Sequence, residues 1–300
     1  MTGPGETPGP FRVRSLMGVL ALVTALSAQS HDTDLPLLTQ ALKDIDAEAQ
    51  IVAWDDPTVD WSSFTAAIIR STWDYHRRLK DFTDWLDRVG SLTSIWNPVD
   101  LIRWNLDKRY LLDVAAWGLP IVPTTVIEVS DDLNEADLTS DIVVKPAIGA
   151  GANGARRIIR DSALARAHAE ALLSSGTAAL VQPYLSAVDS DGETGVVAVG
   201  GMVSHAFAKG AILTGDPTWT DDLYVTEQIA PRVASPAEQD IVDRILRQFP
   251  LTAYARIDLL PTVDGPVVSE IELIEPSLFL HVDPRAAQRA ATAFVSLTSR

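Results

Sequence analysis

The sequence predicts the α/β fold class, and three observations support this prediction. Short apolar runs of strand length, such as 66–70 and 141–145, alternate with longer stretches whose apolar residues recur at helical spacing. The 300 residues are 47% hydrophobic, which is enough to bury the cores of two or three compact units. No internal repeat interrupts the alternation. We therefore expect strands and helices to follow each other along most of the chain.

The first strand is predicted from an apolar run near the start of the chain. A leader rich in glycine and proline, residues 1–12, precedes the run Leu16–Leu26. Two arginines ahead of this run resemble the start of a signal peptide. The helix expected at Leu37–Lys43 and the strand expected at Gln50–Trp54 favour a buried parallel strand instead. No other stretch is long or apolar enough to span a membrane.

The later elements are bounded by residues that start and stop helices and strands. Gly118 and Pro120 end one predicted helix. Ser235 and Glu238 form a capping box around Pro236, which stands at the first position of another helix. In chain order, we expect the strand Ala66–Arg70, the helices Leu79–Val89 and Asn105–Trp117, the strands Ile121–Thr125 and Asp141–Lys145, the extended segment Ala155–Arg160, the helix Ser162–Leu173, the strand Ala178–Gln182, the helix after Ser235, and the strands Tyr254–Leu260 and Val267–Ile274.

The composition argues against several classes of partner and chemistry. A net charge of −16 repels nucleic acid and anionic membranes, so we expect neither as the main partner. The absence of cysteine excludes disulfides, a thiolate nucleophile and a cysteine-ligated metal. It also fits a reducing compartment, and we expect a cytoplasmic protein. The composition carries no information on the oligomeric state.

Lysine is rare in this chain, and three of the lysines stand in unusual surroundings. Nineteen of the 24 basic residues are arginine, so a retained lysine indicates a need for a compact point charge, as in contacts with phosphate oxygens. Lys43 and Lys80 lie among aspartates in helix-like stretches and are expected at the surface. Lys108, Lys145 and Lys209 lie in or beside apolar segments, which is unusual for a solvated lysine.

A glycine-rich segment follows the strand that contains Lys145. Gly149, Gly151 and Gly154 match the spacing of the dinucleotide-binding fingerprint, but that motif requires a helix to open directly on the loop. Here the extended segment Ala155–Arg160 comes next, and no Lys-Ser or Lys-Thr pair follows the last glycine as in a P-loop. Two strands joined by a glycine turn form either a flap whose N–H groups cover phosphates or a structural hairpin. The spacing alone does not separate these alternatives.

Several motifs, taken together and in order, resemble those of the ATP-grasp superfamily of ligases. Lys145, the proline after it and the glycine flap are similar to the second nucleotide lysine and the phosphate loop of that family. The segment 105–108 is similar to the helix with the first nucleotide lysine, and 180–185 to the hinge that binds adenine. The resemblance implies nucleotide contacts from Lys108, Lys145, Gly149, Gly151, Gly154, Gln182, Pro183, Tyr184, Glu193 and Lys209.

The same resemblance implies a domain organisation and cofactors. After the leader, residues 13–104 would form an N-terminal domain with an open parallel sheet that binds the substrate. Residues 105–181 and 182–300 would form two α+β subdomains that clasp the nucleotide. The implied cofactors are ATP and a divalent cation, Mg²⁺ or Mn²⁺.

Acidic residues in the last predicted strands are candidates for metal binding. Glu270 and Glu272 project to the same face of a strand whose other residues are mostly apolar. Burying like charges without a cation is costly, and the alternative is an exposed strand face that carries acids. The resemblance implies that Asp258, Glu270 and Glu272 hold the metal ion. The family's usual Glu-x-Asn pair is Glu-x-Glu here, and Glu275 is left without an assigned role.

Substrate contacts are expected upstream, where loops leave the carboxyl ends of the N-terminal strands. Arg70, Trp73, Asp74 and Tyr75 lie at one such end. The Arg70 guanidinium is suited to a substrate carboxylate and Asp74 to an ammonium group, a pairing that fits an amino acid. The alternative for the nearby tryptophans is that they pack a domain interface.

Segments 70–75 and 103–110 resemble the O-ureido-D-serine cyclo-ligases of D-cycloserine biosynthesis. That resemblance implies an ATP-dependent ligase that phosphorylates the carboxylate of a small amino-acid substrate and closes it intramolecularly onto nitrogen, with Arg256 and Lys209 as catalytic residues. The alternative in the same fold joins two amino acids or an amino acid and an amine, as D-alanine–D-alanine ligase and glutathione synthetase do. A non-catalytic nucleotide-binding protein is the third alternative, against which the three lysines and three acids speak. The roles of Glu275 and His281 stay open.

Overall fold

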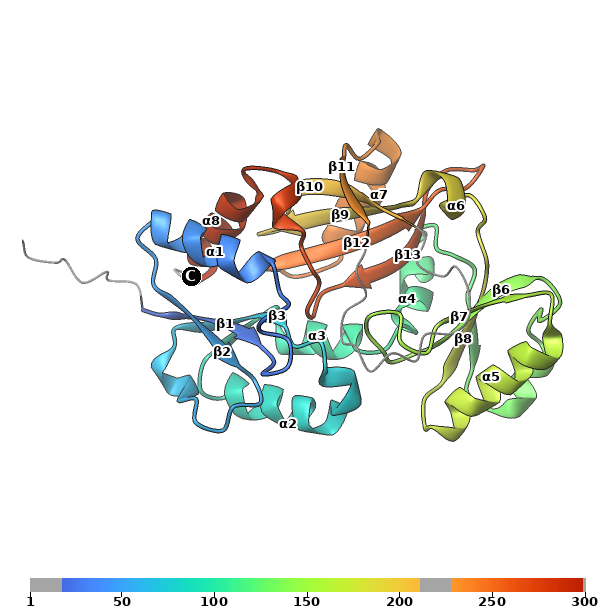
Figure 1. Ribbon diagram of the computed structural model, residues 1–300. Coiled ribbons are helices and arrows are strands. Elements are labelled where there is room, and N and C mark those ends of the chain that lie inside the picture. Colours follow the sequence, from blue (N-terminus) through green and yellow to red (C-terminus); the bar gives the residue numbers. More distant parts are fainter. Residues whose placement is uncertain (1–17, 211–227, 299–300) are drawn as a thin grey trace, which may run out of the picture.

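Three β-sheets organise the part of the chain that the structure describes, residues 18–210 and 228–298, and Figure 1 shows this computed structural model. The N-terminal sheet has the strand order β2-β1-β3-β4, the second sheet β5-β8-β6-β7 and the third β11-β10-β9-β12-β13. Helices cover the sheets, so the α/β class is confirmed. The predicted leader, residues 1–12, lies outside the described residues.

The N-terminal sheet is parallel and has helices on both faces. Its elements are the strands β1 (Leu20–Thr24), β2 (Ala49–Ala53), β3 (Ala66–Ser71) and β4 (Ser94–Trp96), with α1 (Asp34–Asp44) on one face and α2 (Leu79–Gly90) on the other. Strand β1 pairs with β2 and β3, and all its residues are buried. A strand that is covered on both faces must be apolar throughout. The predicted buried strand is thus confirmed over Leu20–Thr24.

Aromatic side chains pack the face of this sheet that carries α2. Phe82 and Trp85 stack with their ring centroids 5.6 Å apart, and Trp54 and Trp61 meet these rings edge-on. Trp54 and Trp61 are 4% and 2% exposed. These two tryptophans therefore pack the core of the N-terminal unit and not a domain interface.

The second sheet carries the predicted glycine flap between two antiparallel strands. The elements of this unit are β5 (Thr125–Ile127), β6 (Asp141–Pro146), β7 (Arg156–Ile159), α5 (Ser162–Ser174) and β8 (Ala179–Pro183). The flap joins β6 to β7, and α5 begins only after β7 has ended. The predicted extended segment is confirmed, and the dinucleotide fingerprint, which needs a helix directly on the loop, is excluded.

The strand predicted at Ile121–Thr125 is confirmed only at its two ends, because Ile121 forms an isolated β-bridge with Val268 and β5 begins at Thr125. The Val122 N–H donates to the Val268 carbonyl at 2.9 Å, and the Val268 N–H donates to the Pro120 carbonyl at 2.9 Å. The apolar run is therefore extended because it pairs with a strand of the third sheet. Such pairing across a long sequence separation leaves no local signal.

The helix predicted at Asn105–Trp117 is confirmed over α4 (Tyr110–Ala116) but wrong in its first turn, because a separate helix, α3 (Val99–Asn105), ends at Asn105 and a turn follows. In the turn between them the Lys108 N–H donates to the Ala147 carbonyl at 2.8 Å. A backbone N–H that finds a partner in the flap is satisfied without an intrahelical bond. The break brings Lys108 to the base of the flap.

The third sheet is antiparallel and places two of the predicted acids opposite each other. Its elements are α6 (Val188–Asp191), β9 (Glu193–Val199), β10 (Met202–Lys209), β11 (Ile229–Arg232), α7 (Pro236–Leu246), β12 (Tyr254–Leu260) and β13 (Val267–Glu272). The register of β12 and β13 sets Asp258 opposite Glu270. The capping box of α7 is confirmed, because Ser235 and Glu238 each accept a hydrogen bond from the other's backbone N–H.

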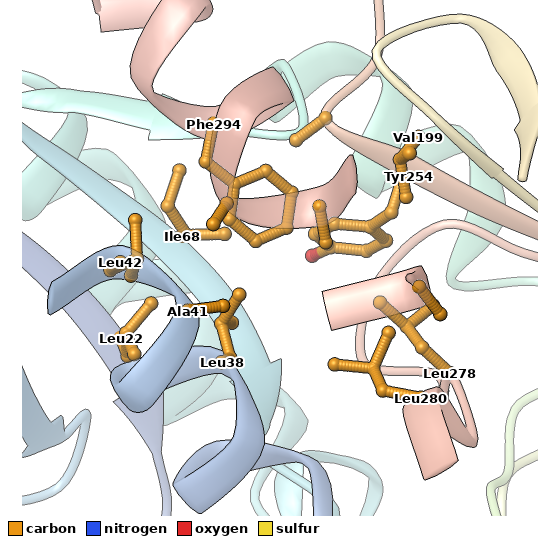
Figure 2. Close-up of a cluster of buried hydrophobic side chains, with 14 of the residues drawn as sticks. Leu22, Leu38, Ala41, Leu42, Ile68, Val199, Tyr254, Leu278, Leu280 and Phe294 are labelled. Atoms are coloured by element: carbon orange, nitrogen blue, oxygen red, sulfur yellow. The ribbon is translucent and has the colours of Figure 1, made fainter. Parts of the chain in front are cut away.

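A core shared by the first and third sheets joins the two ends of the described chain. Helix α8 (Ala286–Thr298) packs beside α1, and Phe294 belongs to the same cluster as Leu38 and Ile68. Figure 2 shows that Tyr254 of β12 reaches this cluster too. The last helix therefore contributes to the core of the N-terminal unit.

Two of the predicted domain boundaries fall inside elements, because 104/105 lies within α3 and 181/182 within β8. We propose boundaries at the turn 106–109 and after Pro183. Short 3-10 helices complete the connections, namely η1 (Trp61–Ser63), η2 (Tyr75–Arg77), η3 (Ser130–Asn134) and η4 (Leu280–Val282). In residues 18–210 and 228–298, no helix has the length and apolarity that a membrane crossing needs.

Candidate active site

One cavity brings together most of the site residues predicted from the sequence. It lies between the flap, the third sheet and the loop that follows β3. The predicted residues that line it are Trp73, Tyr75, Lys108, Lys145, Gly149, Gly151, Gln182, Pro183, Tyr184, Glu193, Lys209, Arg256, Glu270 and Glu272. Glu275 lines the cavity as well.

Arg70 and Asp74, from which substrate contacts are expected, do not line the cavity. The Arg70 side chain is 1% exposed and donates to the Pro276 carbonyl at 2.6 Å. Asp74 accepts a hydrogen bond from the Trp54 indole at 3.0 Å and pairs with Arg78. The Arg70 guanidinium and the Asp74 carboxylate therefore each bond to groups of this chain. Arg70 points into the contact between β3 and the segment after β13, and substrate contacts from Arg70 and Asp74 stay a prediction.

Gly154 and Asp258 also lie outside the lining. The Gly154 carbonyl accepts a hydrogen bond from the His168 ring at 2.9 Å. The Asp258 carboxylate is bonded through both oxygens to Arg256 at 2.9 Å, and Lys209 donates to it at 3.3 Å. Arg256 and Lys209 hold the pKa of Asp258 below its usual range although burial opposes this. Asp258 thus orients two cations that do line the cavity.

Side chains from α3 and α4 hold the outer edge of β13, the strand that carries two of the predicted acids. The Asn105 amide donates to the Ile271 carbonyl at 2.7 Å and accepts from the Leu273 N–H at 2.8 Å. The Tyr110 hydroxyl donates to the Ile271 carbonyl at 2.9 Å and accepts from its N–H at 2.8 Å. These bonds satisfy backbone groups that an edge strand otherwise leaves open. The sequence analysis did not predict that Asn105 and Tyr110 would hold β13. The signal that could have indicated it is a polar side chain at a helix position that is expected to be buried.

Lys108 and Lys209 pair with acids of the lining. The Lys108 ammonium lies 3.0 Å from a Glu270 oxygen and donates to the Gly149 carbonyl at 2.6 Å. Burial is the largest single effect and lowers the pKa of Lys108, but the charge and hydrogen bond of Glu270, together with the charges of Glu272 and Glu275, raise the pKa overall. The Lys209 ammonium lies 2.8 Å from a Glu193 oxygen. The charges of Lys108 and Lys209 are therefore each balanced by a neighbouring acid of the lining.

Lys145 differs from these lysines, because its ammonium makes no hydrogen bond or ion pair with the described residues. Burial lowers the pKa of Lys145, Glu270 partly offsets this effect, and Lys108 adds to it. Lys145 is half-buried, and withdrawing a cation from water without a counter-ion is costly. The position therefore favours an anionic ligand in contact with Lys145.

Two carboxyl groups of the lining have raised pKa values. Burial raises the pKa of Glu272 well above its usual range even though Arg256 pairs with it. Burial also raises the pKa of Glu275 to about 7 against the opposing charge of Lys108. Carboxylates that are crowded in a buried site resist ionisation, and an added cation relieves them.

The carboxylate groups of the cavity are chemically suited to a divalent cation, but they are not arranged as a coordination shell in this structure. Among the described residues, no three acidic or histidine side chains converge as a ready coordination shell. Glu270 and Glu272 nevertheless line the cavity from one face of β13, and carboxylate oxygens are ligands that Mg²⁺ prefers. Asp258 already has both oxygens engaged. Glu270 and Glu272 are therefore the acids whose position suits a cation.

The flap and the hinge present backbone groups to the cavity. Gly151 has a φ of +62°, a left-handed conformation that glycine adopts without strain. The Gln182 side chain is already committed, because it donates to the Thr124 hydroxyl at 2.8 Å. Any ligand that reaches the hinge at 182–184 therefore meets its backbone before the Gln182 amide.

Comparison with known proteins gives this cavity a context. The chain is 38% identical over 293 residues to the cycloserine biosynthesis protein DcsG of Streptomyces lavendulae, and the alignment covers 92% of this chain and 98% of that protein. This chain belongs to the DcsG family. The protein-family model for the N-terminal domain of D-cycloserine synthetase DcsG matches residues 20–97 of this chain.

Solved structures agree with membership of the DcsG family. The crystal structure of D-cycloserine synthetase DcsG is 34% identical with a TM-score of 0.85, and the match covers 94% of this chain and 100% of that one. An ATP-grasp RimK domain protein from Sphaerobacter thermophilus is 18% identical with a TM-score of 0.62, over 92% of this chain and 98% of that one, which shows the same fold. This DcsG-family chain is an ATP-dependent carbon–nitrogen ligase for small molecules, and the predicted ATP-grasp fold and enzyme class are confirmed.

Proposed function

We propose that this chain uses ATP to close O-ureido-D-serine into the ring of D-cycloserine. The observation that carries the proposal is the match to DcsG along nearly the whole of both chains. The cavity supports it, because four cationic side chains from four separate segments line it, and two anionic reactants need such charges: Lys108, Lys145, Lys209 and Arg256. Transfer of a phosphoryl group to a carboxylate requires such neutralisation.

The nucleotide binds between the flap and the third sheet in this proposal. Lys145 is the phosphate contact with the strongest support, because it lies in the cavity without a counter-ion among the described residues. The backbone N–H groups of the flap at 147–154 cover the phosphates. The hinge backbone at 182–184 binds the edge of the adenine ring.

Glu270 and Glu272 would hold Mg²⁺ or Mn²⁺, for the reasons of position given above. A bound divalent ion supplies positive charge that offsets the phosphate oxygens and the crowded carboxylates. Asp258 does not line the cavity, and its hydrogen bonds orient Arg256 and Lys209, which do. This assignment differs from the sequence-based hypothesis in giving Asp258 a positioning role.

The reaction then follows from the positions of the cations. Lys209 and Arg256 neutralise charge while the γ-phosphoryl group passes in line to the substrate carboxylate. The nitrogen attached to the side-chain oxygen attacks the acyl carbon, a carbon–nitrogen bond forms, and phosphate leaves with the carboxyl oxygen. Arg256, whose guanidinium is held by Asp258 and Glu272, stabilises the tetrahedral oxyanion. The carbamoyl group on the ring nitrogen must be removed by water as carbon dioxide and ammonia to give cycloserine.

The test is an incubation of the pure protein with ATP, Mg²⁺ and O-ureido-D-serine, with cycloserine measured by mass spectrometry and ADP by a coupled assay. We expect both products to appear together and to depend on both substrates. ADP formation with a pair of other amino acids, and none with O-ureido-D-serine, would contradict ring closure. That result would favour a ligase of the dipeptide type and leave the nucleotide site intact.

A further inference from the structure

Glu275 lines the cavity but has no part in the reaction described so far. It follows β13, and its backbone is fixed from the N-terminal unit. The Trp73 indole donates to the Glu275 carbonyl at 3.0 Å, and the Arg70 guanidinium donates to the next carbonyl, that of Pro276, at 2.6 Å. The side chain is therefore carried by a segment whose main chain is tied on both sides of the Glu275–Pro276 bond.

The other acids that line the cavity already have basic partners. Glu193 lies 2.8 Å from Lys209, Glu270 lies 3.0 Å from Lys108, and Glu272 pairs with Arg256. The Glu275 carboxylate makes no ion pair with a described residue, and its only hydrogen bond is to its own backbone. Glu275 is thus the lining acid whose charge is not balanced within the described part of the chain.

We infer that Glu275 binds the α-ammonium group of the amino-acid substrate. This inference rests on the proposed function, because it takes an amino acid as the molecule that is activated. The ammonium and carboxylate groups of an α-amino acid are two bonds apart, so the groups that bind them must be neighbours. Arg256, the cation assigned to the reacting carboxyl group, lines the same cavity and donates to the carbonyl of Ser277, two residues after Glu275, at 3.1 Å. An ammonium beside Glu275 compensates a carboxylate whose burial is otherwise unfavourable.

The surroundings of Glu275 suit a cation in other respects. Trp73 and Tyr75 line the cavity beside it, and aromatic faces attract ammonium groups. Glu275 contributes, after burial, the largest charge effect that raises the pKa of Tyr75, which indicates how near the phenol and the carboxylate lie. The raised pKa of Glu275, about 7, would fall when an ammonium binds. The lining of the cavity thus offers one anion without an ionic partner among the described residues and two aromatic rings.

The test compares Glu275→Gln with the wild-type protein on two substrates, O-ureido-D-serine and its analogue without the α-amino group, 3-(ureidooxy)propanoate. ADP release is measured at varied substrate concentration. Loss of one charge-assisted contact should raise the KM for O-ureido-D-serine about 10- to 100-fold, and should leave kcat/KM for the analogue within about threefold of wild type. The KM for ATP should be unchanged. Glu135→Gln removes the same charge at an exposed site that does not line the cavity, and it should leave kcat and KM for both substrates unchanged.

Equal losses on both substrates, or an unchanged KM for O-ureido-D-serine, would overturn the inference. Glu275→Asp keeps the carboxylate, and we expect it to retain most of the wild-type preference for the α-amino substrate. If Glu275→Asp loses that preference as completely as Glu275→Gln does, the result also counts against ammonium binding. If Glu275→Gln does not fold, the result for Glu275→Asp alone decides the question. Wild-type turnover separates this question from the proposed function. If the wild type fails to make cycloserine but releases ADP with another amino acid, the same comparison is made with that amino acid and its deaminated analogue.

Discussion

Charge pairing divides the side chains of the cavity into those that position their neighbours and those that await a ligand. Lys108, Lys209 and Arg256 each have acidic partners at hydrogen-bond distance, so they are held in place before any substrate arrives. Lys145 and Glu275 have no ionic partner among the described residues. Preorganised cations favour charge that develops during reaction, whereas unpaired charges favour binding of the reactants themselves.

Lys145→Ala should weaken ATP binding while the fold stays intact, because the change removes a phosphate contact and little core volume. We expect the dissociation constant for ATP to rise about 10- to 100-fold, which corresponds to one lost charge-assisted hydrogen bond. Isothermal titration calorimetry measures this change. Lys80→Ala is the matched control, because Lys80 is exposed and pairs only with its helix neighbour Asp84. Unchanged ATP affinity in Lys145→Ala would show that the lysine does not contact the nucleotide.

Glu270→Gln and Asp258→Asn should both lower turnover, but in different ways. Glu270→Gln removes a carboxylate that would hold the cation, so activity should recover in part at high Mg²⁺ or Mn²⁺. Asp258→Asn loosens Arg256 and Lys209, so kcat should fall at least tenfold and added metal should not restore it. Titration of activity against Mg²⁺ distinguishes the two. Wild-type activity in Glu270→Gln without extra metal contradicts its role as a ligand.

The flap is the element whose structure should respond most to the nucleotide. It joins β6 to β7, contains Gly151 in a left-handed conformation, and contacts Lys108 through the Gly149 carbonyl. Between residues 148 and 153 this contact is the one hydrogen bond to a described residue distant in sequence, whereas β1 is buried and paired on both sides. Segments of this kind open locally at low free-energy cost.

Amide hydrogen exchange in the flap, residues 147–154, should slow at least tenfold when Mg²⁺ and a non-hydrolysable ATP analogue are added. The physical reason is that the flap N–H groups would donate to phosphate oxygens in the complex. Exchange in β1 (Leu20–Thr24) serves as the internal control and should be the same in both states. Equal protection of the flap with and without the analogue would contradict a phosphate-covering role.

At the scale of the whole molecule, the N-terminal sheet and the third sheet behave as one packed body on their shared side. Phe294 of α8 and Tyr254 of β12 lie in one apolar cluster with residues of α1 and β3, as Figure 2 shows. The Asn97 side chain adds polar connections, because it donates to the carbonyls of Tyr254 and Leu273. This packing sets the distance between the loop that carries Trp73 and the strand that carries the acids.

Phe294→Ala should destabilise the protein by about 3–5 kcal/mol, because it leaves a cavity in that shared core. Urea denaturation measures the change. Unfolding followed by tryptophan fluorescence and by loss of nucleotide binding should shift together, since both units depend on the cluster. Met202→Ala is the control, because Met202 is 73% exposed and its loss should cost no more than about 0.5 kcal/mol. Separate transitions, with only one displaced, would show that the units do not share this core.

Prediction from the sequence succeeded where the signal is local. Leu20–Thr24, the capping box at Ser235 and the strand at Asp141–Pro146 follow from apolar spacing and cap residues, which act over a few positions. It was wrong at 105–109, where the Lys108 N–H bonds to Ala147 instead of continuing a helix, and at 122–124, where the chain lies beside Val268 of the third sheet before β5 begins. Long-range pairing of this kind leaves no periodicity in the segment itself.

The class of fold, most of the elements, and the lysines and acids that build the cavity can all be predicted from the amino-acid sequence. Apolar periodicity and the order of motifs carry that information along the chain. The folded chain was needed to see which acid pairs with which cation and that Arg70 packs against the segment after β13. It was also needed to see that Lys145 and Glu275 line the cavity without ionic partners among the described residues. Glu270 and Lys108 pair across more than a hundred residues of sequence. Charge pairing depends on distance in space, and that distance exists only when three sheets have packed around one cavity.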